Sequence, residues 1–438
     1  MTVTTLRGLP PGPDRPVDEQ LAEFEADPFG CVERMAGTYG ELFTLRLGGL
    51  GNEDLVDVEH NGAWVFLTRA DQLRAMYARD AGTSGALANQ LFFGTDEESV
   101  GYIDGELHRR RRSQLHPAFS GSRDYAVLVA DAVDAHVRRW PRGTELDLFA
   151  ALQAMTSDII VEIVCGAMPA AARARIAEML PRMENAHYGR DEVLAADHEI
   201  RDYLDEALDG HLQRCDEAGL DDVSAALQRH AAEGDEALTP TVVRDEVFSL
   251  LFTGFSTTAN TLSWAVLEVL DDPRVRARLD DEIGDRFATR PVAREAMTGL
   301  EYTDAVLSEA LRLHPVSALN GVRMLVEPME LDGRQLPPGT ILVHCAHLIQ
   351  RDPRNYDDPT RFLPERFLDA TPDPYVFGAF GGGARMCVGR GYALAQMRLV
   401  LAMVLSAVDV RPTGPVPPAR QQGIFMAPER TVCVVADR

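Results

Sequence analysis

One cysteine late in the chain stands in a sequence that could hold a reactive sulfur. Residues 380–389 read FGGGARMCVG, and the helix-forming run RGYALAQMRLVLAMVL follows. Three consecutive glycines let the backbone fold closely against a flat or bulky group. Cys387 then precedes a helix, where the helix dipole and unpaired N–H groups favour a thiolate. Because buried cysteines and glycine-rich turns are each common, the whole pattern, and not the cysteine alone, indicates a functional loop.

This loop resembles the haem-binding loop of the cytochrome P-450 family, Phe-x-x-Gly-x-Arg-x-Cys-x-Gly, at every fixed position. The resemblance implies that Cys387 is the axial thiolate ligand of haem iron, a ligand that favours O–O cleavage. It also implies that Arg385 pairs with a haem propionate and that Phe380 and Gly389 belong to the haem site. Two departures from the family pattern, neither expected to touch the chemistry, are Gln350 and Gln396.

Glu309 and Arg312 stand three residues apart in SEALRLHP, so both side chains lie on one face of a predicted helix. An exposed helical ion pair would contribute only about 0.3–0.5 kcal/mol, and spacing alone leaves that interpretation open. In the P-450 family, a Glu-x-x-Arg helix and a later arginine form a buried network behind the haem loop. The resemblance implies that Glu309, Arg312 and Arg366 form it here, with a structural role in orienting the Cys387 loop.

A long helix is predicted to begin after Thr239, a suitable N-cap followed by Pro240, and to end at Asp272, which precedes a proline. Its centre, TGFST at 253–257, places a glycine and hydroxyl side chains where an apolar pattern should continue. Such residues can bond to backbone carbonyls and open the helix. Either a packing kink or a functional bend would explain this sequence.

The same five residues are similar to the P-450 oxygen-activation motif, Ala/Gly-Gly-x-acid-Thr. The resemblance implies that a bend near Gly254 leaves room for dioxygen, and that Thr257 holds a water and passes on protons. Thr253 and Ser256 depart from the pattern, where alanine and an acid are usual. Because serine is no proton reservoir near neutral pH, we expect altered proton delivery, through waters or with a participating substrate.

A basic run, LHRRRR at 107–112, stands out in an acidic chain, and a solvated helical face is its simplest interpretation. In the P-450 comparison, His108 and Arg112 match a helix that binds the haem propionates. The resemblance makes Arg323, in the strand region after the Glu-x-x-Arg helix, a further candidate for pairing with a propionate. The remaining arginines of the run would belong to a positive face that receives an acidic ferredoxin and speeds association.

The composition is that of a globular protein, with 438 residues, 45% of them hydrophobic and 25% charged. A net charge of −25 argues against a nucleic-acid partner. The six cysteines show no metal-ligand or disulfide spacing, which predicts reduced thiols in a cytoplasmic protein. No secretion signal is visible. The charge-free stretch 248–267 is too polar for a membrane span, so no membrane anchor is expected.

Short β-type runs at 42–47, 64–68, 323–346 and 431–436 flank a helical region between about 105 and 315. Within the third run, Asp332-Gly333 predicts a hairpin turn. We expect a Pro-rich arm over residues 1–20 and one mainly α-helical domain with small β-sheets over 21–438. The resemblance implies the P-450 fold, a triangular prism-like domain with haem between the long central helix and the helix after the cysteine loop.

The resemblance implies a bacterial-type monooxygenase that uses haem b (iron protoporphyrin IX) and O₂ to insert one oxygen atom into an apolar organic substrate. Cys387 stands near the end of the chain, which leaves no room for a fused reductase. Electrons from NAD(P)H are therefore expected through ferredoxin and ferredoxin reductase. A monomer is expected. Two alternatives stay open: a haem-thiolate enzyme for oxidative coupling or rearrangement, favoured by Ser256, and a non-catalytic haem sensor.

The substrate pocket is expected from segments 83–101, 168–203, 316–320 and 423–426 and from the long helix. These segments are apolar with few charges, which suits a lipid, terpenoid or polyketide-like natural product. Large apolar side chains could equally fill the core. The residues proposed to line the pocket are Phe252, Phe255, Val316, Ala318 and Phe425.

Overall fold

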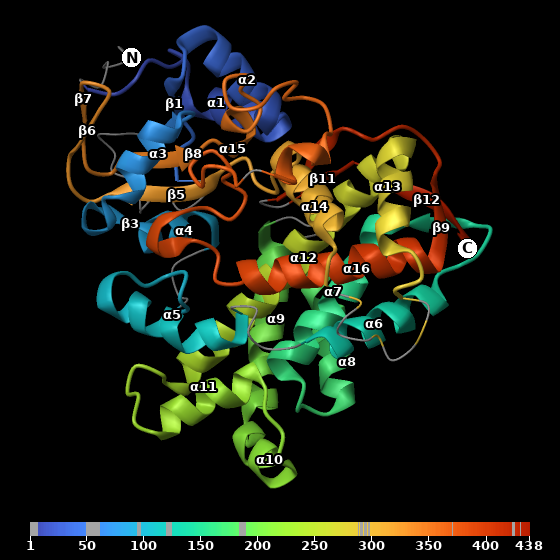
Figure 1. The fold of residues 1–438 in the computed structure, drawn as a ribbon. Helices are drawn as coiled ribbons and strands as arrows, with labels where there is room; N and C mark the ends of the chain where they lie inside the picture. Colours follow the sequence, from blue (N-terminus) through green and yellow to red (C-terminus); the bar gives the residue numbers. More distant parts are fainter. Residues whose placement is uncertain are drawn as a thin grey trace. The chain divides into compact units, whose positions relative to one another are not determined.

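The computed structural model describes residues 8–49, 62–93, 98–119, 125–183, 190–287, 289, 292, 296, 298–369, 371–422, 425–429 and 431–438. Its contacts divide the chain into two compact units (Figure 1). Unit 1 comprises Met1–Arg112, Ser317–Arg361 and Thr371–Cys387, and unit 2 comprises Ser113–Val316, Phe362–Ala370 and Val388–Arg438. The single domain expected over 21–438 stays a prediction.

Unit 1 is built on a five-stranded sheet with the strand order β1-β2-β8-β5-β3, in which β2 and β8 are parallel and the other pairs antiparallel. The strands of this sheet are β1 (Leu42–Arg46), β2 (Ala63–Leu67), β3 (Thr83–Ser84), β5 (Asn320–Leu325) and β8 (Ile341–His344). Two further strands of unit 1, β6 (Met329–Leu331) and β7 (Arg334–Leu336), form a separate hairpin. The helices of unit 1 are α1 (Val17–Ala26), α2 (Pro28–Tyr39), α3 (Ala70–Tyr77), α4 (Gly85–Phe93) and α15 (Ala346–Ile349). Helix α5 (Gly105–Phe119) begins in unit 1 and ends in unit 2.

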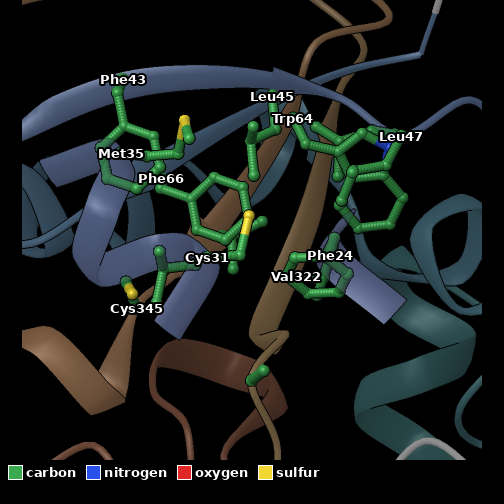
Figure 2. Close-up of a cluster of buried hydrophobic side chains, with 14 of the residues drawn as sticks. Phe24, Cys31, Met35, Phe43, Leu45, Leu47, Trp64, Phe66, Val322 and Cys345 are labelled. Atoms are coloured by element: carbon green, nitrogen blue, oxygen red, sulfur yellow. The ribbon is translucent and has the colours of Figure 1, made fainter. Parts of the chain in front are cut away.

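Unit 1 has one buried apolar cluster between the sheet and helices α1 and α2, and a second that includes Leu73 and Met76 of α3. Figure 2 shows Phe43 of β1 and Phe66 of β2 beside Cys31 and Met35 of α2. The rings of Phe43 and Phe66 stack with their centroids 5.0 Å apart. Because aromatic residues alternate along the paired strands, one sheet face buries a large apolar area against the helices.

The proline-rich arm is shorter than predicted, because helix α1 already begins at Val17. Residues 1–7 of the predicted arm lie outside the described residues. The described part runs beside β1, where the backbone N–H of Thr44 donates to the carbonyl of Pro11 over 2.9 Å. The hydroxyl of Thr44 donates to the carbonyl of Pro10, also over 2.9 Å. Proline lacks an N–H, so these contacts use only its carbonyl groups.

The predicted hairpin is confirmed. Strands β6 and β7 pair antiparallel, with Leu331 opposite Arg334, and Asp332 and Gly333 both have positive φ angles, of 50° and 71°. Two successive positive φ angles are typical of the tight turn that an Asp-Gly pair favours. The predicted strands at 42–47, 64–68 and 431–436 also exist, each shifted by about one residue.

Unit 2 is mainly helical. Its helices are α6 (Ala126–Arg139), α7 (Leu148–Cys165), α8 (Ala170–Met179), α9 (Arg190–Leu208), α10 (His211–Ala218), α11 (Val223–Ala232), α12 (Pro240–Asp271), α13 (Pro273–Ile283), α14 (Glu301–Leu313) and α16 (Arg390–Ala407). Its strands are β4 (Glu145–Asp147), β9 (Val408–Pro412), β10 (Ala419–Gln422), β11 (Phe425–Pro428) and β12 (Val432–Asp437). They form a sheet in the order β4-β12-β9 and a β10-β11 hairpin. The sequence did not predict β3, β4, β9, β10 and β11.

Helix α12 is the central helix of unit 2 and has the predicted limits (Figure 1). The hydroxyl of Thr239 accepts from the N–H of Val242 over 3.3 Å, and Asp272 ends α12 and caps α13. Most of its 32 residues are buried, and it packs along α7. Helix α7 is long and apolar enough by composition to cross a membrane, but 72% of it is buried, as is usual for a core helix.

Candidate active site

The Cys387 loop closes on itself at the C-terminal end of unit 1. The N–H of Cys387 donates to the carbonyl of Phe380 over 2.9 Å, and a single 3₁₀ turn spans Gly383–Arg385. Cys387 is exposed, whereas the other five cysteines are buried and none of the six is in a disulfide. This loop therefore presents the one thiol of the chain that is accessible to a ligand.

Each of the three consecutive glycines at 381–383 has a physical reason. Gly381 and Gly383 have φ angles of 68° and 65°, which side chains rarely adopt. A Cβ atom on Gly382 would lie 2.6 Å from Cε2 of Tyr77, so only glycine fits against this ring. Tyr77, the last residue of α3, thus forms a floor under the glycine run.

The side chain of Tyr77, which packs under the glycine run, is held in place by a buried histidine on β8. The hydroxyl of Tyr77 lies 3.0 Å from Nδ1 of His344, which is fully buried. A Cβ atom on Gly378 would lie 2.2 Å from Nε2 of His344, and this nitrogen has no hydrogen-bond partner in the described part of the chain. Burial, with a contribution from Arg323, lowers the pKa of His344 to about 3, so the ring is neutral.

Three more side chains of unit 1 bond to the loop backbone. Asn320 Nδ2 donates to the carbonyl of Gly378 over 2.6 Å, and Arg323 Nη2 donates to the carbonyl of Gly382 over 3.1 Å. The side-chain oxygen of Gln350 accepts from the N–H of Gly378 over 2.9 Å. Gln350 was expected not to touch the chemistry, and this bond gives it a supporting contact with the loop backbone. Gln396, the other departure, is buried on α16.

The predicted propionate residues form a cationic cluster in unit 1: His108, Arg112, Arg323 and Arg385. Burial, Arg385 and Arg112 lower the pKa of His108 to about 4, with a smaller contribution from Arg323, while Asp104 opposes the shift. Burial and Arg385 also lower the pKa of Arg112, while Cys387 raises it. His108 is therefore neutral near pH 7, and Arg112 and Arg385 are two cations that repel one another.

Arg385 is bonded more extensively than the sequence suggested. It donates to the carbonyl of Gly101 over 3.1 Å and contacts the carbonyl of Ile103 and the carboxylate of Asp104. Gly85 provides its space, because a Cβ atom there would lie 2.2 Å from Cδ of Arg385. Of the arginines between His108 and Arg112, Arg111 is buried, so the predicted positive face can include only Arg109 and Arg110.

The structure brings Glu309, Arg312 and Arg366 together in unit 2. Arg312 donates from Nε and Nη2 to the two carboxylate oxygens of Glu309 over 2.6 and 2.8 Å. Arg366 Nε donates to Glu309 Oε1 over 3.1 Å, and the N–H of Leu363 donates to the same oxygen over 2.8 Å. Glu309 and Arg312 are fully buried, so the weak exposed ion pair is excluded. The role of this network in orienting the Cys387 loop stays a prediction.

The largely buried centre of helix α12 carries a row of exposed or partly exposed side chains, which we call the open stripe. Phe252, Thr253 and Thr257 are at least partly exposed, at helical spacing, whereas their neighbours are mostly buried. The hydroxyls bond back to carbonyls one turn earlier, Thr257 to Thr253 over 3.0 Å and Thr253 to Ser249 over 2.7 Å. The helix is assigned without interruption from Pro240 to Asp271, and the predicted bend near Gly254 stays a prediction.

The other two predicted residues of this motif face the protein interior. A Cβ atom on Gly254 would lie 2.7 Å from Cγ1 of Ile160 on α7, so this glycine permits close packing of the two helices. Ser256 is buried, and Asn260 Nδ2 donates to its hydroxyl over 3.5 Å. Asn260, one turn after Ser256, was not predicted, and its side-chain oxygen has no hydrogen-bond partner among the residues that the structure describes.

Four of the five predicted pocket residues lie together in unit 2. The ring of Phe252 lies 6.4 Å from that of Phe255 and 6.4 Å from that of Phe425. The N–H of Met426 donates to the carbonyl of Val316 over 2.9 Å, which places Val316 beside β11. Phe255 is fully buried and Phe252 only partly so.

Ala318 belongs to the buried core cluster of unit 1. Residues 94–97, 184–189 and 423–424 of the predicted pocket segments lie outside the described residues.

Comparison with protein families decides the classification. The model of the family described as Cytochrome P450 matches residues 176–434, which is more than half of the chain. The chain belongs to the cytochrome P450 family. The match includes the Glu309 network, helix α12 and the Cys387 loop.

Bacterial P450 proteins are similar over most of the chain. The putative cytochrome P450 135B1 of Mycobacterium tuberculosis is 29% identical over 94% of this chain and 88% of its own length. Pentalenene oxygenase of Streptomyces avermitilis is 28% identical over 73% of this chain and 75% of its own. Cyclooctat-9-en-7-ol 5-monooxygenase of Streptomyces melanosporofaciens is 29% identical over 72% and 73%, respectively.

Membership of the P450 family implies a haem cofactor, O₂ as a substrate and an oxidoreductase of the monooxygenase class. The donor set of unit 1 fits haem. Cys387 is exposed, and Arg112 interacts electrostatically with its sulfur, which favours the thiolate. Arg112 has no carboxylate at ion-pair distance among the described residues, and it lies near His108, which is neutral, and near Arg385, a second cation that repels it. Two anionic propionates would relieve that repulsion.

Proposed function

We propose that this P450 is a haem-thiolate monooxygenase that inserts one oxygen atom of O₂ into an apolar natural product or lipid. The observation that carries the proposal is the exposed thiol of Cys387 beside the uncompensated guanidinium of Arg112. We propose haem b as the cofactor, ferredoxin and a NAD(P)H-dependent ferredoxin reductase as the electron source, and a monomer in the cytoplasm.

In this proposal the cofactor is held by unit 1. Haem supplies the redox centre at which O₂ is reduced, and Cys387 supplies the thiolate that ligates its iron. Arg112, His108 and Arg323 bind the propionates, with Arg385 released in part from Asp104 to join them. Tyr77 and the side chains that bond to the loop backbone keep the sulfur in place.

A spectroscopic experiment tests the ligand. Treated with carbon monoxide after reduction, the wild-type protein should show the red-displaced Soret absorption of a thiolate-bound haem. Cys387→Ser should lose that band while retaining bound haem, because a hydroxyl is a poor substitute for a thiolate. Cys433→Ser, a matched change of a buried cysteine, should keep it. A red-displaced band in Cys387→Ser, or none in the wild type, would refute the proposal.

Proton delivery is proposed to run along the open stripe of α12. The hydroxyl of Thr257 is partly exposed and bonds only to a backbone carbonyl of its own helix, so it can turn to hold a water. Ser256 cannot serve as a proton reservoir, and it is buried against Asn260. We therefore propose that solvent or the substrate supplies the proton that an acid supplies elsewhere in the family.

The yield of product per NAD(P)H consumed measures this pathway. Thr257→Ala should lower the yield severalfold and raise peroxide release, because the water loses its hydroxyl partner. Thr258→Ala is the matched control, since that neighbouring hydroxyl is buried. Ser256→Asp should change the yield if an acid can act there. Unchanged coupling in Thr257→Ala and Ser256→Asp would overturn the proton pathway.

The proposed substrate is apolar. Phe252 is the partly exposed member of a ring cluster with Phe255 and Phe425, which suits contact with hydrocarbon. Two relatives are named for pentalenene and for cyclooctat-9-en-7-ol, which are hydrocarbon-rich molecules. Screening a compound panel by the haem spectrum should find ligands whose affinity falls in Phe252→Ala. Phe248→Ala, on the same helix but buried under Arg201, should change affinity less.

A second candidate is oxidative coupling or rearrangement, and Ser256 at the position of the usual acid favours it. Product masses separate the two functions. Monooxygenation adds one oxygen atom to the substrate, whereas coupling removes hydrogen without adding oxygen. Gas binding without NAD(P)H consumption, in the presence of any substrate of the panel, would instead indicate a sensor.

Electron delivery is proposed to depend on a positive face that includes Arg109 and Arg110, both exposed on α5. Because exposed charges act mainly on association rates and are screened by salt, reduction by ferredoxin should slow as ionic strength rises. Replacing both arginines with glutamine should weaken this salt dependence. Reduction that is insensitive to salt and to these changes would exclude the face.

A further inference from the structure

A buried cluster in unit 2, which we call the α10–α11 cluster, has no part in the proposed function. It consists of His211 and Cys215, one turn apart on α10, and Asp222, the N-cap of α11. His211 and Cys215 are fully buried and Asp222 is 3% exposed. One ligand atom of each residue lies within 4.8 Å of the other two.

The contacts of the α10–α11 cluster converge on one nitrogen. Nε2 of His211 lies 3.5 Å from the sulfur of Cys215 and 3.1 Å from each carboxylate oxygen of Asp222. In a catalytic relay, sulfur and carboxylate would use opposite ring nitrogens. Around a tetrahedral zinc ion, bond lengths imply about 3.5 Å between nitrogen and sulfur and about 3.3 Å between nitrogen and oxygen. The observed separations match those of a coordination shell.

The carboxylate is held in position by backbone donors. The N–H of Ala225 donates to Oδ1 of Asp222 over 2.8 Å, and the N–H of Ala167 donates to Oδ2 over 3.0 Å. Such outer bonds orient a ligating carboxylate. Because both oxygens are equally distant from Nε2, Asp222 can bind a cation through both, at the narrow angle that one carboxylate imposes. The cluster then offers four donor atoms, one nitrogen, one sulfur and two oxygens, in a shell that departs from a regular tetrahedron.

The charges also suit a dication. Zinc with one thiolate, one carboxylate and a neutral imidazole is neutral overall, which removes the cost of burying a net charge. Metal binding would displace the thiol proton.

We propose that His211, Cys215 and Asp222 bind Zn²⁺ in a closed structural site that is independent of the haem. The ion joins the short helix α10 to the start of α11 and, through Asp222, to the segment after α7. Helix α10 has eight residues between two left-handed glycines, Gly210 and Gly219, and a helix of this length needs tertiary anchoring. The spacing of the cysteines did not predict the site, because it combines three different residue types.

Metal analysis of the haem-containing protein tests this inference. Wild-type protein from zinc-supplemented cells, dialysed free of loose metal, should contain about one zinc per chain beside its haem iron. Cys215→Ser and His211→Gln should lower the zinc content at least tenfold, whereas Cys433→Ser should not. Absorption spectroscopy at the zinc edge should show a single sulfur ligand. Wild-type protein without stoichiometric zinc, or equal zinc in wild type and Cys215→Ser, would overturn the proposal.

A second measurement uses the wild-type protein, so that the proposal can be tested even if the variants do not fold. Removal of zinc by a chelator should lower the unfolding midpoint by several degrees, and Zn²⁺, but not Mg²⁺, should restore it. Haem absorption should stay unchanged, since the site is separate from Cys387. An unfolding midpoint that ignores both chelator and Zn²⁺ would also overturn the proposal.

Discussion

Two groups of buried or half-buried cations, one in each unit, differ in how their charge is compensated. In unit 2, Arg312 and Arg366 share the carboxylate of Glu309, which also accepts from a backbone N–H. In unit 1, Arg112 has no carboxylate at ion-pair distance among the described residues, and its pKa is lowered by burial and Arg385. Both oxygens of the Glu309 carboxylate already accept hydrogen bonds, so this group has no place for a ligand. Cations that repel one another instead form a site for an anion. The first group is built for stability and the second for binding.

The largest expected effect is on the compensated group. Glu309→Gln leaves two guanidiniums without their carboxylate, so the free energy of unfolding should fall by about 3–5 kcal/mol. Denaturant titration followed by circular dichroism measures it. Glu301→Gln, an exposed change at the start of the same helix, should cost less than about 0.5 kcal/mol. A small loss in Glu309→Gln would mean that the network is not what stabilises unit 2.

The opposite result is expected for the uncompensated group. Arg112→Gln should weaken haem binding about 10- to 100-fold, a loss of about 1.4–3 kcal/mol, because a charged hydrogen bond to a propionate is lost. The free energy of unfolding of the haem-free protein should stay the same or rise, since repulsion with Arg385 is relieved. Haem transfer to an acceptor protein measures the affinity, with exposed Arg109→Gln as control. Unchanged haem retention would remove the distinction between the two groups.

A smaller effect is expected where the loop meets its floor. Gly382→Ala puts a Cβ atom 2.6 Å from the ring of Tyr77, which should cost about 1–2 kcal/mol of stability and shift the thiolate band. Truncation of the ring in Gly382→Ala/Tyr77→Ala should recover part of the band position, although the cavity costs stability. If both variants are equally perturbed, steric contact with Tyr77 is not the cause.

The smallest expected effect is a pH dependence in unit 1. The pKa of His344 is lowered to about 3 in the folded protein by burial and Arg323. Between pH 6.5 and 3 the unfolded chain therefore binds a proton that the folded protein does not. The free energy of unfolding therefore decreases as the pH is lowered through this window, by up to about 1.4 kcal/mol per pH unit for one group. His344→Gln should make the slope shallower, measured by urea unfolding at pH 6.5 and 5. An unaltered slope would mean that another group titrates.

Much of the site could be predicted where its signals are local in sequence. The glycine run and cysteine of residues 380–389, the three-residue spacing of Glu309 and Arg312, and the cap of α12 are each contained within a few residues. The structure placed them in a loop, a buried ion pair and a helix start, as expected. The missed residues, such as Tyr77, His344 and Asn320, meet the Cys387 loop from distant parts of the chain.

By itself, the sequence determined which residues can do chemistry, because residue type and short spacing set the donor atoms and their local backbone. It indicated the cysteine ligand, the family and the limits of the central helix. Only the tertiary structure decided which charges are compensated. Arg312 and Arg112 look alike in sequence, yet one is buried against a carboxylate and the other beside further cations. Burial and neighbouring charge depend on contacts between distant segments. These contacts decide whether an arginine stabilises the fold or can bind an anion.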